Sequence, residues 1–470
     1  MDGRAAAAEG MALLARGRFA EAAAAFASAA RLLPHDADIA FALGVAWIQA
    51  GRPAEAAEAW RGTLRLAPAH PAAGYNLARA LTELGDWGGA EAAYRAHLAH
   101  RPDDADAHYN LANLLYRRGE RAGAIAAHDA ALALRPDHGP GLVNRALALD
   151  ASGRPAEAEA DFRRALALDP RSVDAHWNLS LLLMKQGRWA EGLAEYEWRR
   201  MLPGAPQAPW GLSEWSGTEP AGTRVLVWND QGIGDALMFL RHLPALAARG
   251  AVPLLVVQDP LAQLAAAVPG AAGASGFSDP PPAADAHLPL SSLPLRLGVT
   301  DPLAWPGQPW LAPVSRPPAT VERPAVGLMW SGNPGTDDAR HVPVGALAPL
   351  LAVPGITFYS LQVGAAAADC PPGVNDLSPL LVDFAATAAV LAEIDLVVTV
   401  DTAVAHLAGA MGRPAWVMLQ RLADWRWSGG ETTPAYPSLR LFRQEDLGQW
   451  DGVVAAISRA LAARFAAFRQ

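Results

Sequence analysis

Residues 75–85 read YNLARALTELG, and residues 109–119 read YNLANLLYRRG, 34 positions further along the chain. The glycine that ends each stretch recurs at the same spacing through the first two hundred residues. The glycines in this series are Gly17, Gly51, Gly85, Gly119, Gly153 and Gly187. Self-similarity at one fixed period is typical of proteins built from stacked copies of a small supersecondary unit. The sequence therefore predicts a helical solenoid in the N-terminal part of the chain.

Each 34-residue unit contains the side chains that a pair of antiparallel helices needs. The glycine can end the first helix in a left-handed backbone conformation. A small alanine lets two helices approach closely, and a ring four residues later lies on the same helix face. A proline then stops the second helix. The alanines are Ala22, Ala56, Ala90, Ala124 and Ala158; the rings are Phe26, Trp60, Tyr94, His128 and Phe162; the prolines are Pro34, Pro68, Pro102, Pro136 and Pro170.

This pattern resembles the tetratricopeptide repeat over residues 3–203, a stretch that holds six units. The sixth unit keeps Gly187 and Tyr196, but Gly192 replaces the alanine and Pro203 is displaced by one position. We expect such a departure in a unit that is followed by a different domain.

Four asparagines share the same spacing and fall on the first helix of their hairpins: Asn76, Asn110, Asn144 and Asn178. In a solenoid these helices line the concave face, where an amide side chain can both donate to and accept from a peptide backbone. The row resembles the asparagine ladder of the O-GlcNAc transferase superhelix, which implies an acceptor protein or peptide bound along it. The alternative is that these side chains cap or bridge neighbouring hairpins.

Composition excludes several classes of protein. The chain has 470 residues, a net charge of −9 and no block of Lys and Arg, so we expect no nucleic-acid partner. Cys370 is the one cysteine, which leaves no internal disulfide and no cysteine-based metal site. The sequence has no long uncharged apolar run and no signal-peptide pattern at its start. We therefore expect no membrane span and a cytoplasmic location.

Helical periodicity stops in residues 204–223, which are rich in Pro and Gly and are predicted to be a linker. Beyond it, short apolar strands alternate with helices, as in parallel sheets built from βαβ units. Two series of strands predict two Rossmann-like lobes, at residues 224–316 and 317–470, with ligands at the carboxyl ends of the strands. The expected strands are Val225–Trp228, Pro253–Val257, Ala325–Trp330, Thr357–Gln362, Leu396–Asp401 and Ala415–Leu419.

In the first lobe, Gly232, Gly234 and Asp235 follow the first strand and precede a helix expected over residues 236–249. The glycines permit close backbone approach, and the helix N-terminus favours an anion. The alternative is a tight strand–helix turn capped by Asp235.

In the second lobe, three loops carry polar or aromatic side chains. Arg340 and His341 precede a helix, and arginine suits phosphate oxygens; a solvated loop is the alternative. Asp401 ends a strand, Thr402 opens a helix and His406 lies one turn further on; a buried structural histidine is the alternative. Trp425 and Arg426 can stack on a ligand and pair with phosphate; packing over the sheet edge is the alternative. The donor-binding candidates are Gly232, Gly234, Trp330, Asn333, Arg340, His341, Gln362, Asp401, Thr402, His406, Trp425 and Arg426.

These loops together resemble GT-B glycosyltransferases, in particular the heptosyltransferase group (glycosyltransferase family 9). The order of the domains resembles O-GlcNAc transferase-like proteins with tetratricopeptide arrays. The resemblance implies that Asp235 is the general base on the acceptor hydroxyl. It also implies that Arg340, where a lysine is usual, and Asp401-Thr402 with His406 bind the donor diphosphate, with Ala403 where a glycine is usual.

We therefore expect a metal-independent transferase that moves a sugar from a nucleotide sugar to a protein held by the repeats. The nucleotide sugar is a substrate, and no cofactor is expected. The alternative is a non-catalytic repeat scaffold with a degenerate sugar-nucleotide-binding domain, which the short first lobe favours. A lipopolysaccharide glycosyltransferase would need a basic or amphipathic lipid-facing surface, which the sequence lacks.

Overall fold

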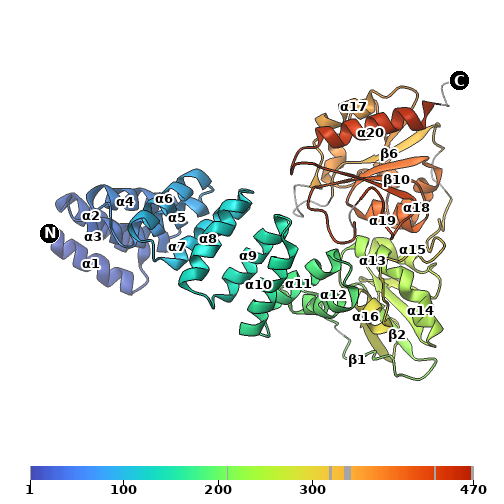
Figure 1. Ribbon diagram of the computed structural model, residues 1–470, viewed down its shortest axis with the longest axis horizontal. Coiled ribbons are helices and arrows are strands. Elements are labelled where there is room, and N and C mark those ends of the chain that lie inside the picture. Colours follow the sequence, from blue (N-terminus) through green and yellow to red (C-terminus); the bar gives the residue numbers. More distant parts are fainter. Residues whose placement is uncertain (1, 209, 317–319, 333–339, 428–429, 467–470) are drawn as a thin grey trace. The chain divides into compact units, whose positions relative to one another are not determined.

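The computed structural model describes residues 2–208, 210–316, 320–332, 340–427 and 430–466. The chain forms two compact units, Met1–Leu179 and Ser180–Gln470 (Figure 1). Asn333, one of the predicted donor-binding residues, lies outside the described residues.

The first unit is built from helical hairpins, in which each odd-numbered helix packs on the even-numbered helix that follows it. Figure 1 shows these helices following one another along the stack. Helix α11 (Val173–Lys185) runs across the boundary between the two units. The preceding helices are α1 (Gly3–Ala15), α2 (Phe19–Leu32), α3 (Ala37–Gln49), α4 (Pro53–Leu66), α5 (Ala73–Glu83), α6 (Trp87–His100), α7 (Ala105–Arg117), α8 (Arg121–Leu134), α9 (Gly139–Ala151) and α10 (Pro155–Leu168).

The glycines and aromatic rings on which the predicted hairpins depend have the expected roles in the structure. All six glycines of the series have a positive φ, from +72° at Gly17 to +80° at Gly119, so each ends a first helix in a conformation that disfavours a side chain. Phe26 and Trp60 are 1% and 2% exposed and fill the space between the helices. The predicted solenoid of helical hairpins is confirmed.

The second unit begins with the end of the sixth hairpin and a five-stranded parallel sheet. Its strand order is β1-β5-β2-β3-β4. The strands are β1 (Ser213–Glu214), β2 (Arg224–Trp228), β3 (Val252–Val257), β4 (Gly273–Gly276) and β5 (Ala286–Pro289). The helices and turns are α12 (Trp189–Tyr196), η1 (Glu197–Met201), α13 (Ile233–Phe239), η2 (Leu240–His242), α14 (Leu243–Ala248), η3 (Asp259–Leu261), α15 (Ala262–Ala265), η4 (Leu290–Ser292) and α16 (Leu293–Leu297).

A second parallel sheet follows, with six strands in the order β11-β10-β9-β6-β7-β8. Its apolar core includes Trp330, Trp416 and helix α20 (Asp451–Arg464). The strands are β6 (Ala325–Met329), β7 (Thr357–Ser360), β8 (Asn375–Asp376), β9 (Leu396–Val400), β10 (Ala415–Leu419) and β11 (Leu439–Arg443). The helices and turns are η6 (Val344–Leu347), α17 (Ala348–Leu351), η7 (Ala365–Asp369), η8 (Ser378–Leu380), α18 (Phe384–Glu393) and α19 (Ala403–Ala410). The predicted α/β class is confirmed.

Two details differ from the sequence-based expectation. The segment 204–223, expected to be a linker, contributes β1 to the first sheet. The single helix expected over residues 236–249 is interrupted at η2, where the Arg241 side chain donates to the Met238 carbonyl and Pro244 follows. Within the described residues, no helix has the length and apolar character that crossing a membrane requires.

Candidate active site

The loop after β2 is held by a partly buried network of amide side chains. The Asn229 side chain donates to the Gln231 carbonyl at 2.8 Å and to Gln258 Oε1 at 2.7 Å. Gly232 precedes α13 in extended conformation, and Asp235 lies in the first turn of that helix. The network therefore fixes the loop from which the Asp235 carboxylate projects.

Asp235 of the first lobe forms an ion pair with Arg426 of the second lobe. The same guanidinium donates to Asp424 Oδ1 at 2.6 Å, and its Cζ lies 4.4 Å from the Trp425 ring centroid. The Asp235 and Arg426 side chains are only 18% and 14% exposed. The pair therefore joins the first turn of α13 to a loop 191 residues further along the sequence, at a poorly solvated point.

The surroundings change the acidity of these groups. Burial raises the pKa of Asp235 above its usual range, although Arg426 acts in the opposite direction. Burial alone would lower the pKa of Arg426, but Asp235 and Asp424 outweigh burial and raise it, so the guanidinium stays charged. The arrangement provides a carboxylate with increased proton affinity beside a permanent cation.

The N-terminus of α19 is the second element of the site. Thr402 is its N-cap residue, and among the described residues no side chain caps the first turn. The Thr402 hydroxyl lies 3.0 Å from Thr399 Oγ1. Arg340 Nη1 lies 3.6 Å from Asp401 Oδ2 at the end of β9. Free amides at a helix N-terminus beside a guanidinium are suited to an anion such as a diphosphate.

Asp401 is held in a strained electrostatic environment. Its pKa is raised to about 6, because burial disfavours the charged form and Asp424 repels it, while Arg340 partly offsets both. A raised pKa in the folded state means that ionisation favours unfolding. The associated stability is therefore present below about pH 4 and is lost as the pH rises through 6.

Asp401→Asn should raise the free energy of unfolding at pH 8 by up to about 3 kcal/mol, since each unit of pKa shift corresponds to about 1.4 kcal/mol. The gain should shrink as the pH is lowered toward 4. Urea unfolding of the full chain across this pH range measures it, with Asp446→Asn, at an exposed carboxylate, as the control. A gain that is the same at every pH would contradict the ionisation argument.

His406 is a buried, neutral side chain at the junction of the lobes. Its Nδ1 lies 2.8 Å from the Tyr436 hydroxyl, and burial lowers its pKa to about 3. A Cβ on Gly234 of the first lobe would lie 2.9 Å from His406 Cδ2. Gly234 therefore provides the space for this imidazole. His406 contributes no positive charge to a diphosphate at neutral pH, and it occupies the buried position that was the alternative interpretation.

Several predicted donor-binding side chains are buried in the protein interior. Trp330 is 2% exposed in the core of the second lobe, and Trp425 is 1% exposed. The Trp425 ring packs in the core, as in the alternative interpretation, and is not exposed for stacking on a ligand. Donor binding by Trp330 stays a prediction. Gln362 is also buried, and its Oε1 accepts from the Trp330 and Ser331 amides at 3.2 and 2.9 Å. His341 is partly buried beside Arg340.

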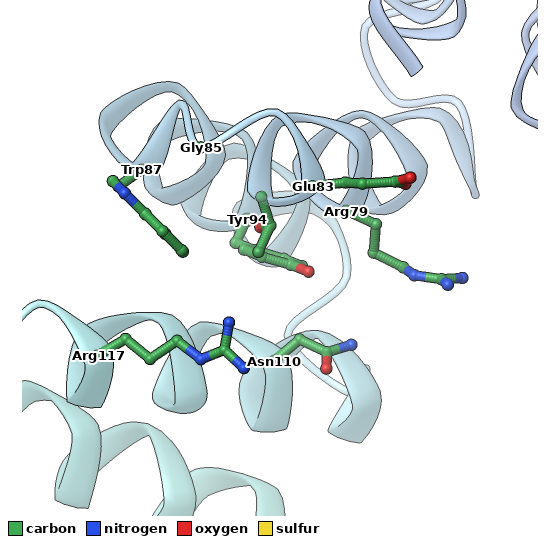
Figure 2. Close-up of a pocket in the computed structure, with 8 residues that line it drawn as sticks. Arg79, Glu83, Gly85, Trp87, Tyr94, Asn110 and Arg117 are labelled. Carbon is green, nitrogen blue, oxygen red and sulfur yellow. The ribbon is translucent and has the colours of Figure 1, made fainter. Parts of the chain in front are cut away.

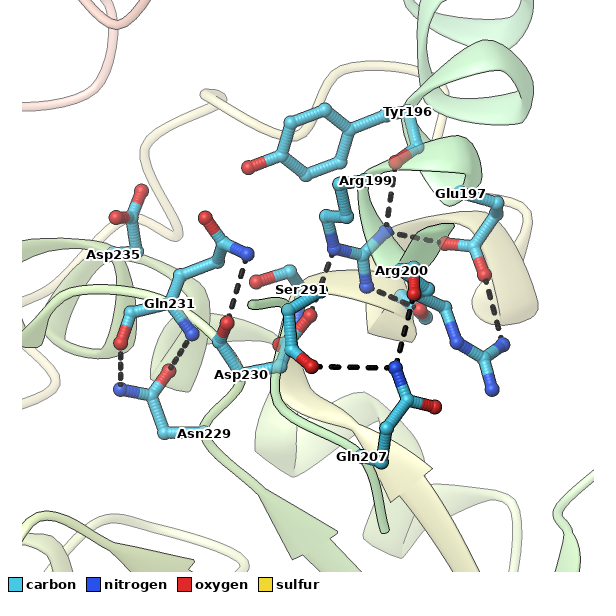
Figure 3. A network of polar contacts seen from close by, with 12 residues as sticks. Tyr196, Glu197, Arg199, Arg200, Gln207, Asn229, Asp230, Gln231, Asp235 and Ser291 are labelled. Atoms are coloured by element: carbon cyan, nitrogen blue, oxygen red, sulfur yellow. Dashed lines mark hydrogen bonds and ion pairs between the residues drawn. The ribbon is translucent and has the colours of Figure 1, made fainter. Parts of the chain in front are cut away.

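An arginine that the sequence analysis did not single out lies at the centre of a second buried network (Figure 3). Arg199, in η1, is 1% exposed. Its Nε lies 2.8 Å from Asp230 Oδ2, and its Nη2 donates to Ser292 Oγ at 2.6 Å. Asp230 also accepts from the Ser291 amide at 3.2 Å. The network ties η1 to the loop that leads to Asp235.

Aromatic rings fill the contact between the lobes behind Asp235. Trp310 Nε1 donates to the Leu237 carbonyl in α13 at 3.0 Å, and its ring stacks on Tyr436 with centroids 5.8 Å apart. Arg241 lies over both rings, at 4.4 and 5.0 Å from their centroids. Tyr436 in turn contacts His406. This cluster positions α13 against α19.

Comparison with known proteins bears on both units. The family sequence model of the tetratricopeptide repeat matches residues 7–73, 75–138 and 143–209. The N-terminal region is a tetratricopeptide-repeat array. The model of glycosyltransferase family 9 (heptosyltransferase) matches residues 366–417, which contain β9, the Asp401–His406 segment and part of β10. The second lobe is therefore glycosyltransferase-like over this stretch.

One curated relative is Protein FlbA of Caulobacter vibrioides, 29% identical over 295 residues, which are 53% of this chain and 48% of that protein. The chain thus spans about half the length of this relative. Similar solved structures include MamA protein, with 23% identity, a TM-score of 0.35 and coverage of 36% of this chain and 92% of that one. Another is YrrB, described as a TPR protein with an unusual peptide-binding site, with 17% identity, a TM-score of 0.34 and coverage of 36% and 88%.

Within the tetratricopeptide array, two of the four regularly spaced asparagines bond to a tyrosine of the preceding repeat. Asn110 donates to the Tyr75 hydroxyl, and Asn144 donates to the Tyr109 hydroxyl, both at 2.9 Å. Asn178 donates to the Asp174 carbonyl at 2.8 Å, and Asn76 is partly buried on α5. The bonds of Asn110 and Asn144 bridge neighbouring repeats, whereas the bond of Asn178 lies within α11. Each amide oxygen retains lone pairs for a ligand. Protein binding by the row stays a prediction.

Proposed function

We propose that this protein is a glycosyltransferase that moves a sugar from a nucleoside diphosphate sugar to a hydroxyl group of a protein bound by the repeats. The observation that carries the proposal is the Asp235–Arg426 pair, which places a partly buried carboxylate and a permanent cation together where the two lobes meet. The family match over Asp401–His406 and the uncapped α19 N-terminus support the same assignment.

In this proposal, the donor diphosphate binds at the first amides of α19, and Arg340 balances part of its charge. Asp235 accepts the proton of the acceptor hydroxyl as its oxygen bonds to the sugar carbon. The bond from that carbon to the diphosphate oxygen breaks, and the nucleoside diphosphate leaves with the electron pair. Arg426 offsets negative charge that develops on the leaving group. A diphosphate that competes for Arg426 also releases Asp235 to act as the base.

The first test is donor turnover. The purified full chain, incubated with a panel of nucleoside diphosphate sugars, should release the nucleoside diphosphate from one of them, by hydrolysis or by transfer to added protein. Binding of a nucleoside diphosphate without any turnover would favour the scaffold alternative. Absence of both binding and turnover across the panel would overturn the proposal.

Arg340→Gln should weaken binding of that nucleoside diphosphate by roughly ten- to a hundredfold, the value of one or two charged hydrogen bonds. Isothermal titration calorimetry measures the Kd. Arg421→Gln is the matched control, because Arg421 is 54% exposed and its nearest carboxylate is Asp446 at 3.6 Å. Equal affinity in wild type and Arg340→Gln would remove Arg340 from the site.

A further inference from the structure

The third and fourth repeats form an open pocket of about 510 Å³ between α5, α6 and α7. Figure 2 shows Arg79 and Glu83 on one wall, with Asn110 and Arg117 on the facing helix and the Trp87 and Tyr94 rings beside them. The Tyr94 ring is 2% exposed, whereas Trp87 is 37% exposed. The pocket thus combines two guanidinium groups with an accessible indole.

The two arginines differ from their neighbours in the array. Arg118 pairs with Glu91 and Glu120, and Arg95 pairs with Glu91. Among the described residues, neither Arg79 nor Arg117 has a carboxylate within ion-pair distance; Arg79 instead lies 5.9 Å from the Tyr75 ring centroid. Such arginines, unlike their paired neighbours, are available to an external carboxylate.

Glu83 is the one carboxylate of the lining, and it opposes an acidic ligand. It stands four residues after Arg79 on the same helix, within reach of that guanidinium when the side chains rotate. Two positive charges against one leave the pocket with a net charge of +1. The balance favours an anion and predicts that removing Glu83 strengthens its binding.

Asn110 both lines the pocket and belongs to the asparagine row. Its Nδ2 is bonded to the Tyr75 hydroxyl, so its Oδ1 is the atom that can accept from a peptide N–H. Asn76 and Asn144 lie one repeat to either side. A peptide backbone that follows the asparagine row continues past the pocket in both directions. The group that enters the pocket is therefore a side chain from the middle of the peptide, rather than a chain terminus.

We propose that this pocket binds an aspartate or glutamate side chain of an extended segment in the acceptor protein, next to an apolar residue that packs on Trp87. The inference rests on the proposed function for the identity of the peptide as an acceptor. It gives the array a sequence preference, which a row of asparagines that contacts only backbone does not supply.

The test measures peptide binding by the full chain without any nucleotide sugar. The probe is a fluorescein-labelled, C-terminally amidated peptide of Ser and Ala with one central Asp-Leu pair; the matched probe has Asn-Leu instead. Fluorescence anisotropy should show about tenfold tighter binding of the Asp peptide at low salt, and the difference should shrink as salt is added. A third peptide, with Asn-Leu and a free C-terminal carboxylate, separates a terminal carboxylate from a side chain.

The double variant Arg79→Gln, Arg117→Gln should reduce binding of the Asp peptide to that of the Asn peptide, and Glu83→Gln should strengthen it. Arg65→Gln, at an exposed arginine of α4 outside the pocket, is the control. Circular dichroism checks that the variants fold. Equal binding of Asp and Asn peptides, or an Asp preference that survives the double variant, would overturn the assignment. Donor turnover is measured separately, without peptide. A negative result for peptide binding would therefore overturn this inference without overturning the proposed transferase activity.

Discussion

Replacing Asp235 with asparagine is expected to lower the rate of sugar transfer by about 10²–10⁴-fold, the usual contribution of a general base. Asparagine keeps the shape of the side chain and one oxygen for Arg426, but it cannot take the proton of the acceptor hydroxyl. Affinity for the nucleoside diphosphate should not fall and should rise modestly, because asparagine, unlike the Asp235 carboxylate, does not compete strongly with the diphosphate for Arg426. Single-turnover transfer and calorimetric binding of the same protein measure the two quantities.

The pH dependence of the wild-type rate supplies a second check on this role. Burial raises the pKa of Asp235, and only the ionised form can act as a base, so the rate should fall as the pH is lowered through that raised pKa. Asp446→Asn, at an exposed carboxylate of the second lobe, is the matched control for the variant. A rate in Asp235→Asn equal to that of wild type would assign the proton transfer to another group.

Arg199→Met is expected to destabilise the C-terminal unit by about 3–5 kcal/mol, the range found when one partner of a buried ion pair is removed. The Asp230 side chain is 3% exposed, and without the guanidinium its charge would be buried without a counterion. Calorimetric unfolding of the full chain should show the loss in the transition of the unit that holds Arg199, while the transition of the array stays in place.

Two further variants separate this loss from a general effect of removing an arginine. Arg200→Met removes the next residue, which is 32% exposed and pairs with Glu214, and it should cost about 0–1 kcal/mol. Adding Asp230→Leu to Arg199→Met removes both charges and should recover much of the stability. No recovery in the double variant would show that packing, rather than an unpaired charge, explains the effect.

The array was predictable because the sequence signals that specify its helical hairpins are local and are repeated in each unit. Each glycine with a positive φ ends the helix that precedes it and depends on no distant residue. The 34-residue period repeats this signal in all six units. Strands rich in Val and Leu, such as β3 and β9, were also predictable. Strand β4 reads GASG and has no apolar pattern, and β1 has two residues, so neither carries a signal that a single sequence reveals. Their pairing is set by the neighbouring strands.

The site was predictable in its parts and not in its contacts. Loops at strand ends drew attention to Asp235, Arg340 and Asp401, and the fold brings Arg340 to Asp401. The contact between Asp235 and Arg426 spans 191 residues, and no local spacing encodes it. From the sequence, Trp425 and Trp427 could equally have stacked on a ligand or packed in the core. In the structure both rings are buried in the core. Arg199 gave no signal, because a single arginine at a helix end is common on protein surfaces.

The position of η1 has a consequence for how such proteins can diversify by recombination. The compact C-terminal unit starts at Ser180, inside the sixth repeat. It holds Arg199 in its interior and uses β1 as an edge strand of its first sheet. A gene fusion made at the first residue of β2 would discard both, and would leave Asp230 without its counterion. An exchange of repeat arrays between relatives must therefore cross over before α12, so that the last half-repeat is inherited together with the transferase-like lobes.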